Sequence, residues 1–183
     1  MIDRAQYVPG SADLAKIAKK NGEKWTLVLE RELRHAPDKV WKALTDPSEL
    51  HEWAPFDADT SMDKVGASVN ITWVGTPAPV EVKVTRADAP KVLEYSTGEN
   101  EIRWELEPIP NGTRLTLYAV IERPYVSMGA AGWHIAFDVL ERLLNGNPLN
   151  RISGADAMKF EGWQRLNAEY AQQFGVELPK WGG

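Results

Sequence analysis

The chain has 183 residues, of which 43% are hydrophobic and 26% charged, a balance typical of one soluble globular domain with a buried core. Its net charge is −5 and it has no basic cluster, which argues against nucleic acids and anionic membrane surfaces as partners, because both are recognised through Lys and Arg. The lack of cysteine excludes a disulfide framework and a thiolate metal site.

The first residues carry no apolar segment of the kind that directs secretion, and no apolar run reaches the roughly 20 residues of a membrane span. We therefore expect a cytoplasmic protein. Residues 1–22 are polar, and we expect them to form an N-terminal extension with one short helix from Ala12 to Lys20 that the fold does not need. Residues 23–183 are expected to form a single domain. The sequence leaves open whether the protein is a monomer or a homodimer.

The first clear element is a strand from Trp25 to Leu33, in which apolar residues alternate with polar ones. A period of two is typical of a half-buried strand. Two short helices are predicted next. The first begins at Pro37, a residue suited to the first helical position. The second follows Asp46, whose side chain can cap it, so the two helices should meet at a corner there.

From Asp57 to Glu122 the pattern is strand after strand. Runs of alternating apolar residues are separated by short segments that contain turn residues, among them Asn111 and Gly112. Asn-Gly between two strands is a strong hairpin signal. Short connections between consecutive strands predict an antiparallel meander.

Two amphipathic helices are predicted after the meander. The first spans Ala130 to Gly146, and its apolar arc is so wide that it should be covered on two sides. The second spans about Asp156 to Phe174. Because a meander cannot bury both of its faces alone, the first of these helices should lie across one face. The predicted fold class is α+β: a curved antiparallel sheet that wraps around a long C-terminal helix, with two short helices after the first strand.

A histidine and an aspartate, His134 and Asp138, lie one turn apart in the first of these helices. On a helical wheel they fall on the polar arc, away from the stripe that should face the sheet. We therefore predict an exposed surface pair that can be replaced at little cost, on the order of 0.5 kcal/mol. The other histidines, His35 and His51, lie in separate elements. No catalytic residue, metal site or cofactor is predicted, because a metal needs three or four converging ligands.

Aromatic residues on the inward parity of the strands and the helix are the stronger functional signal, since such side chains line ligand pockets as well as cores. Tyr95 and Tyr118 are candidate polar groups of a pocket, whereas strand parity places Arg103 outside. Simple core packing is the alternative interpretation. If Trp104 lines a cavity, its replacement by Ala should cost about 1–3 kcal/mol, less than in a filled core. The predicted ligand-binding residues are Trp53, Phe56, Trp73, Tyr95, Trp104, Leu106, Leu117, Trp133, Phe137 and Leu140.

Four segments, in chain order, are RELRHAPDKVWKALTDPSELHEWAPF, EYSTGENEIRWELEPIPNGTRLTLYAVI, AAGWHIAFDVLERLLNG and GWQRLNAEYAQQFG. They resemble the SRPBCC superfamily, also called START or Bet v 1-like helix-grip proteins, and more narrowly its bacterial branch of activator of Hsp90 ATPase homolog 1-like proteins. The resemblance covers roughly residues 24–175. It implies a cavity between sheet and helix that often holds a hydrophobic small molecule, but no single reaction, because one fold hosts many functions. Residues 1–22 and 147–160 lie outside the pattern.

The sequence favours a non-enzymatic binding protein for a small hydrophobic or amphipathic ligand, because no convergent acid–base or nucleophilic set is readable. The family's name suggests an alternative, a protein-interaction module that modulates a chaperone or another ATPase. An enzyme of the cyclase or dehydratase kind, as found elsewhere in the superfamily, also stays open. It would need a buried titratable side chain inside the cavity.

Overall fold

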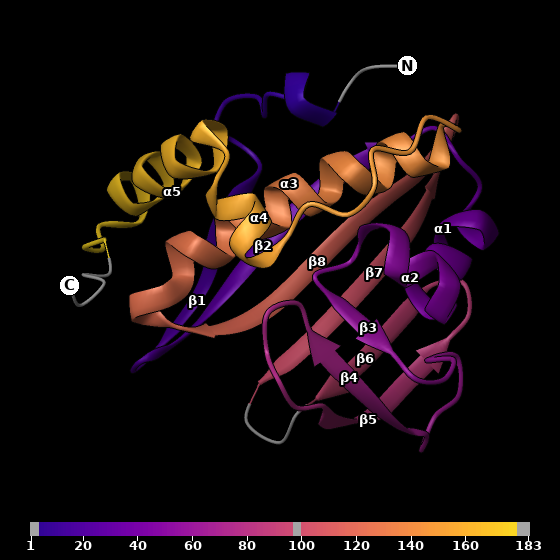
Figure 1. Cartoon of the computed structure of the whole chain (residues 1–183). Coiled ribbons are helices and arrows are strands. Elements are labelled where there is room, and N and C mark those ends of the chain that lie inside the picture. The colour runs from indigo at the N-terminus through magenta and orange to yellow at the C-terminus, as the bar shows by residue number, and fades with distance from the viewer. Residues whose placement is uncertain (1–3, 97–99, 179–183) are drawn as a thin grey trace.

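The computed structural model describes residues 4–96 and 100–178 (Figure 1). Within them, eight antiparallel strands form one sheet in the order β1-β2-β8-β7-β6-β5-β4-β3. In chain order the elements are η1 (Arg4–Gln6), β1 (Ala15–Asn21), β2 (Lys24–Leu33), α1 (Pro37–Thr45), α2 (Pro47–Trp53), β3 (Phe56–Ala58), β4 (Ser68–Trp73), β5 (Val80–Asp88), β6 (Val92–Ser96), β7 (Glu101–Ile109), β8 (Gly112–Glu122), η2 (Arg123–Tyr125), α3 (Val126–Leu144), α4 (Gly154–Met158) and α5 (Glu161–Phe174).

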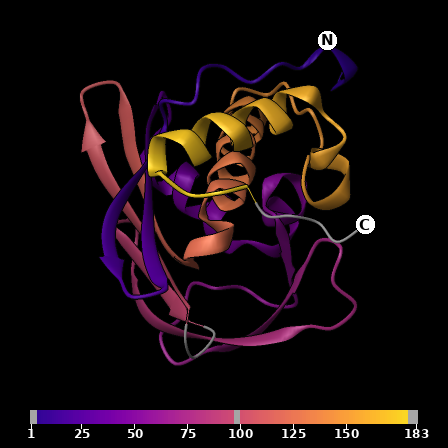
Figure 2. The same ribbon diagram turned by 90° about the vertical axis from the view of Figure 1, so that its left-hand side faces the viewer.

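The sheet curls around α3, which lies across its concave face, and α5 packs on the side of α3 that points away from the sheet (Figure 2). The apolar residues of β2, β7 and β8 that share the inward parity are buried against this helix. The sheet covers α3 on one side and α5 covers it on the other, which explains why its apolar arc is so wide. The predicted α+β helix-grip fold is confirmed.

The corner between α1 and α2 is held by side chains that the sequence pattern singles out. Asp46 accepts a hydrogen bond from the Ser48 backbone N–H at 2.8 Å, which caps α2. Trp53, at the end of α2, is fully buried and donates its indole N–H to the Ala43 carbonyl oxygen at 2.9 Å. The predicted corner is confirmed, and it fixes the two short helices at one end of the sheet.

The predicted helix from Ala12 to Lys20 is wrong, because this segment contains the edge strand β1, paired with β2 from Ala15 to Asn21. The two short helices therefore follow the second strand and not the first. A register shift between Ile17 and Lys19 interrupts the alternation of β1, so the apolar residues no longer show a period of two. The exposed lysines of β1 suit an edge strand, because charged side chains discourage pairing with another chain. A domain boundary at residue 23 would separate two paired strands.

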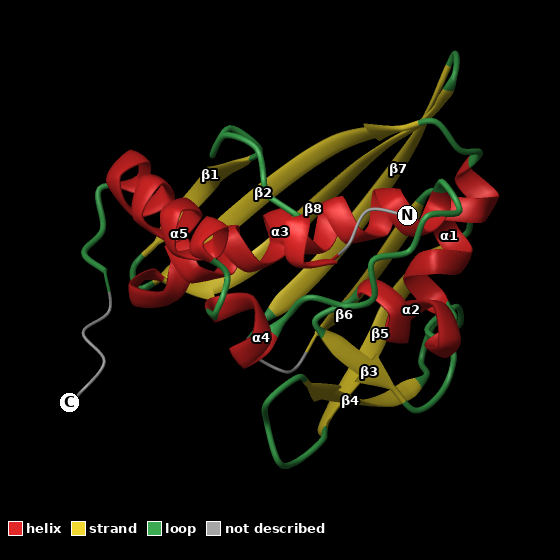
Figure 3. Cartoon of the chain, turned by 45° about the horizontal axis from the view of Figure 1, so that its top comes forward, coloured by secondary structure: helices red, strands yellow, loops and turns green. Residues whose placement is uncertain are grey.

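The segment between α3 and α5 returns alongside α3, on the side of α2 and β3 (Figure 3). Leu149 and Ile152 are buried there, and Arg151 forms two hydrogen bonds to the Asp57 carboxylate, at 2.7 and 3.2 Å. These bonds hold the pKa of Asp57 below its ordinary value. The long final helix predicted from Asp156 to Phe174 is in fact two helices, α4 and α5, because the backbone is extended at Phe160.

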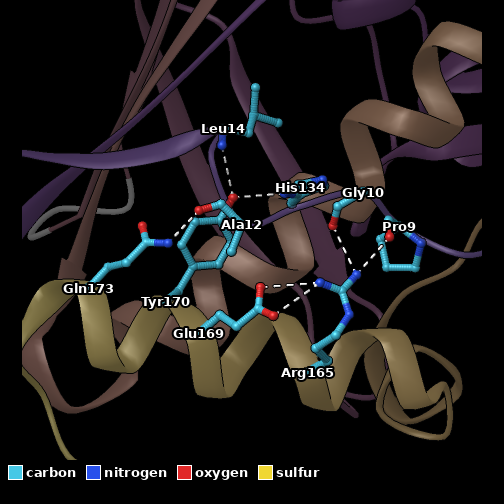
Figure 4. A network of polar contacts seen from close by, with 9 residues as sticks. All are labelled: Pro9, Gly10, Ala12, Leu14, His134, Arg165, Glu169, Tyr170 and Gln173. Atoms are coloured by element: carbon cyan, nitrogen blue, oxygen red, sulfur yellow. Dashed lines mark hydrogen bonds and ion pairs between the residues drawn. The ribbon is translucent and has the colours of Figure 1, made fainter.

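Residues 4–14, which we call the N-terminal strap, run over α5 and the outer face of α3. Arg165 of α5 donates to the carbonyl oxygens of Pro9 and Gly10, at 2.7 and 2.9 Å, and Gln173 donates to that of Ala12 at 2.6 Å (Figure 4). Tyr7, Ala12 and Ala15 are buried. The strap and β1 are thus fastened to the domain by both backbone acceptors and apolar contacts.

The prediction that His134 and Asp138 form an exposed pair is also wrong. Only 3% of His134 is exposed, because the strap and α5 cover this face of α3. The Tyr170 hydroxyl accepts the backbone N–H of Leu14 at 3.2 Å and shares a 2.7 Å hydrogen bond with His134 Nδ1 (Figure 4). It also accepts the backbone N–H of Ala15 at 3.2 Å. Since Tyr170 already accepts twice, its proton goes to His134 Nδ1, which must be unprotonated. Burial lowers the pKa of His134, which favours this neutral form.

Asp138 lies in the same buried layer. It accepts a hydrogen bond from the Tyr7 hydroxyl and forms an ion pair with Arg31 of β2 at 2.6 Å. Burial, followed by the nearby carboxylate, raises the pKa of Tyr7, so that the phenol remains a donor. Both polar residues of α3 therefore join the strap, α5 and the sheet to this helix, and their replacement is not expected to be near neutral.

Candidate functional site

An apolar cavity of about 350 Å³ lies between the concave face of the sheet and the first half of α3. Strands β4, β6, β7 and β8 supply one wall, and η2 and α3 supply the other. The described residues that line it are Ile71, Trp73, Tyr95, Asn100, Ile102, Ala119, Val120, Ile121, Glu122, Tyr125, Gly129 and Trp133.

Three aromatic side chains form much of the interior surface. Trp73 lies at the end of β4 and is half-buried, whereas Tyr95 of β6 and Trp133 of α3 are buried. The Trp73 and Tyr95 rings both contact the Phe56 ring in a T-shaped arrangement, at centroid distances of 5.3 and 6.3 Å. Phe56 thus holds two of the lining rings in place from behind, which gives the cavity a preformed shape.

Apart from the buried Tyr95, most polar residues of the lining lie at its rim. Asn100 precedes β7, Glu122 ends β8 and Tyr125 closes η2 with half of its surface exposed. Lys24 donates to Asn100 Oδ1 at 2.9 Å and lies 3.8 Å from a Glu122 carboxylate oxygen. The rim therefore carries a hydrogen bond and a pair of oppositely charged side chains, while the interior presents mainly carbon.

A close approach at one point narrows the cavity. Gly129 of α3 faces Ile121 of β8, and a Cβ atom placed on Gly129 would lie only 2.5 Å from Ile121 Cδ1. Gly132, one turn further along the same helix, has nothing within 4 Å of the corresponding position. Because Gly129 has no side chain, α3 can approach β8 closely here and no side chain of residue 129 takes up space in the cavity.

Of the ten predicted ligand-binding residues, the structure places Trp73, Tyr95 and Trp133 in the cavity lining. The other seven lie outside the lining and are buried in the continuous core: Trp53, Phe56, Trp104, Leu106, Leu117, Phe137 and Leu140. Trp104 is central to that core, since its ring packs against Trp53, Trp133 and Phe137 at centroid distances of 5.9, 5.6 and 6.0 Å.

The polar candidates separate as strand parity requires. Tyr95 faces inward, whereas Tyr118 and Arg103 lie together on the outer face of the sheet, in a shallow hollow with Glu94 and Glu105. Arg103 lies 2.7 Å from a Glu105 carboxylate oxygen there. Tyr118 therefore does not contribute to the apolar cavity.

Sequence reasoning missed most of the aliphatic lining. Ile71 shares its strand parity with Trp73, and Ile102 shares it with Trp104, so their inward direction was readable. The sequence did not show, however, that they lie beside the cavity and not in the packed part of the core. Gly129 gives no sequence signal of its own, because a helical glycine has many possible reasons.

A second hollow, of about 500 Å³, lies between the strap and the outer face of α3. It is bordered by Tyr7, Asp138, Glu141 and Arg142 among others, and its carboxylates are already engaged: Arg31 lies 2.6 Å from Asp138 and 3.3 Å from Glu141. This hollow is larger but polar, and its charged groups hold the strap to the helix. The apolar cavity is the better candidate site.

The three histidines are separated in the fold: His35 shares a hydrogen bond with Asn145, His51 with Asp57 and His134 with Tyr170. In the part of the chain that the structure describes, no three side chains of His, Asp or Glu lie close enough together to hold a metal ion. None of the described helices has the length and hydropathy needed to cross a bilayer.

A family model described as activator of Hsp90 ATPase homolog 1-like protein matches residues 34–145. A solved protein from Mesorhizobium loti is 28% identical with a TM-score of 0.56, over 68% of this chain and 99% of that one. A conserved protein of unknown function from Enterococcus faecalis is 17% identical with a TM-score of 0.64, over 89% and 92%. CalU16 from Micromonospora echinospora is 19% identical with a TM-score of 0.62, over 88% and 93%. No curated protein gives a significant match.

Proposed function

The chain belongs to the family of activator of Hsp90 ATPase homolog 1-like proteins, and from this fold and its cavity we propose that it is a binding protein for a small hydrophobic or amphipathic molecule. The observation that carries the proposal is the cavity itself. At about 350 Å³ it lies within the range of ligand sites, roughly 300–1,000 Å³, and aromatic and aliphatic side chains dominate its lining.

The placement of titratable groups favours binding over catalysis. An acid–base catalyst must reach the substrate and exchange a proton near neutral pH. Among the described lining residues, Glu122 is the one carboxylate, and it lies at the rim beside Lys24. Burial raises the pKa of Tyr95 far above its ordinary value, so this hydroxyl keeps its proton. These positions support a holding role more than a cyclase or dehydratase reaction.

A protein-docking role, which the family description suggests, is less well supported. The large apolar side chains that are exposed within the described residues come from five separate segments of the chain: Val8, Val65, Val80, Tyr125 and Leu178. Contiguous apolar patches, and not single exposed residues, mark protein interfaces. We therefore place ligand binding first.

Filling the cavity from α3 tests the proposal. Replacing Gly129 with Leu should weaken binding of the uncharged dye N-phenyl-1-naphthylamine by at least about tenfold, because a side chain there would meet Ile121 and occupy part of the cavity. Dye fluorescence, titrated with each protein, gives the dissociation constant. Replacing Gly132 with Leu is the matched control, since it makes the same change on the same helix in open space. Both changes favour the helix by about 0.8–1 kcal/mol.

Unchanged dye affinity in a folded Gly129→Leu protein would place the dye elsewhere and contradict the proposal. If Gly129→Leu lowers the melting temperature strongly, Gly129→Ala gives a smaller intrusion at the same point and should weaken binding in the same direction. A protein that binds no apolar dye or other uncharged apolar compound would return the docking module to first place.

A further inference from the structure

One of the residues that line the cavity carries a buried hydroxyl. Tyr95, on β6, is 1% exposed, and its backbone pairs with Ile102 on β7. Its oxygen accepts a hydrogen bond from the indole N–H of Trp104 at 3.2 Å. Trp104 belongs to the packed core and cannot turn away, because its ring is enclosed by three other aromatic rings. The core therefore fixes the position of the Tyr95 oxygen.

The proton of this hydroxyl has no acceptor in residues 4–96 and 100–178. Tyr95 is the acceptor in the bond from Trp104, and within these described residues its side chain makes no other hydrogen bond. A phenol can donate one hydrogen bond and accept others at the same time. Buried donors almost always have a partner, because an unpaired donor forfeits the hydrogen bond that it would make to water.

The surroundings of Tyr95 determine what kind of acceptor can reach it. The nearby lining is uncharged, with Ile71, Trp73, Ile102 and Trp133 among its members, and the carboxylate of Glu122 lies at the rim. A negatively charged ligand would have to leave water for this apolar space and pass that carboxylate, which is costly for an unpaired ion. A neutral oxygen acceptor has no such penalty.

Resting on the proposed function, we propose that the ligand is an uncharged apolar compound with a carbonyl-type oxygen, such as a ketone, ester or quinone, which accepts the hydrogen bond of the Tyr95 hydroxyl inside the cavity. The aromatic and aliphatic walls hold the hydrocarbon part. Tyr95 selects for the acceptor and fixes its orientation, as single polar groups do in otherwise apolar pockets.

A pair of nearly isosteric probes isolates the hydrogen bond: 2-acetylnaphthalene, a ketone, and 2-isopropylnaphthalene, a hydrocarbon. Their affinities are measured by displacement of N-phenyl-1-naphthylamine. Replacing Tyr95 with Phe should weaken binding of the ketone by about fivefold to tenfold, as expected for one hydrogen bond, and leave the hydrocarbon unchanged. Replacing Tyr118 with Phe is the control, because it removes a hydroxyl from the outer face of the sheet, away from the cavity, and should alter neither affinity. The carboxylate 2-naphthoate should bind at least about tenfold more weakly than the ketone.

The native protein supplies a second measurement that does not depend on the folding of Tyr95→Phe. The carbonyl stretch of bound, ¹³C-labelled 2-acetylnaphthalene should lie at lower frequency than in hexane, because hydrogen bonding weakens the C=O bond. A frequency equal to that in hexane overturns the inference, as does an equal loss of both probes, or of neither, on replacing Tyr95. Those outcomes leave apolar binding in place. If neither probe binds the native protein, the proposed function is contradicted, and this inference is contradicted with it.

Discussion

Replacing Trp104 with alanine is expected to lower the free energy of unfolding by about 3–5 kcal/mol, the cost of removing a large side chain from a filled core. The side chain is 1% exposed, and it contacts Trp53 from α2 as well as Trp133 and Phe137 from α3. Its removal also leaves the Tyr95 oxygen without its donor. This figure replaces the smaller cost expected from the sequence, which assumed that Trp104 has an open side. Urea unfolding measures the change.

Trp73 is the matched control for that experiment. It is also a tryptophan on the concave face, but it is half-buried and lines the cavity. Its replacement by alanine should cost about 1–3 kcal/mol, because part of its surface faces space that is already open. Equal and small costs for both replacements would mean that the packed core around Trp104 is not present in solution.

Removing residues 1–21 is expected to lower the melting temperature by about 10 °C or more, or to abolish cooperative unfolding, because several kcal/mol are lost and each shifts Tm by roughly 2–4 °C in a domain of this size. The deletion takes away β1 and leaves the edge of β2 unpaired. It also removes the buried Tyr7 and the two backbone donors to the Tyr170 hydroxyl. Calorimetry and circular dichroism on heating give the comparison with the full chain.

A shorter deletion separates the strap from the strand. Removing residues 1–13 keeps β1 and should cost less than removing 1–21, since the ladder with β2 remains. A protein that starts at Gly22 and melts cooperatively within about 3 °C of the full chain, a shift of roughly 1 kcal/mol, would restore the expectation that the extension is dispensable.

Most of the fold was readable from the sequence because its signals are local. The alternation from Trp25 to Leu33, the Asn-Gly pair at residues 111 and 112 and the capping Asp46 each act within a few residues, and each corresponds to an observed strand, hairpin or helix start. The strand β1 was misread for an equally local reason. Its register shift after Ile17 leaves Leu14, Ile17 and Ala18 at helical spacing, and only the pairing with β2 decides between the two structures.

The errors at His134 and Asp138 have a different origin. A helical wheel separates polar from apolar residues, but it does not reveal that a polar arc will be buried by partners that are themselves polar. Those partners, Tyr7 and Tyr170, lie more than 30 residues away in the chain, at 131 and 36 positions respectively. Their hydrogen bonds satisfy the buried polar groups, so the polar arc is buried without leaving these donors and acceptors unpaired.

The sequence showed which face of the sheet carries the candidate site, but not where on that face the cavity lies. Strand parity tells which face of the sheet a residue occupies, and it placed Trp73, Tyr95 and Trp104 correctly on the concave face. It does not tell how far α3 lies above that face at each point. Near α2 the helix and the sheet are in contact through Trp104 and Phe137, whereas near η2 they leave a cavity.

The indole N–H resonances of the tryptophans give the most direct test of ligand binding in this cavity. The chain has eight tryptophans, and single Trp→Phe variants assign their signals in ¹⁵N spectra of the native protein. Titration with 2-acetylnaphthalene should shift the resonances of Trp73 and Trp133, which line the cavity, and leave those of Trp41 in α1 and Trp163 in α5 in place. Signals of Trp73 and Trp133 that stay fixed at saturating ligand, or a shift at Trp163 in their stead, would contradict a ligand site between the sheet and α3.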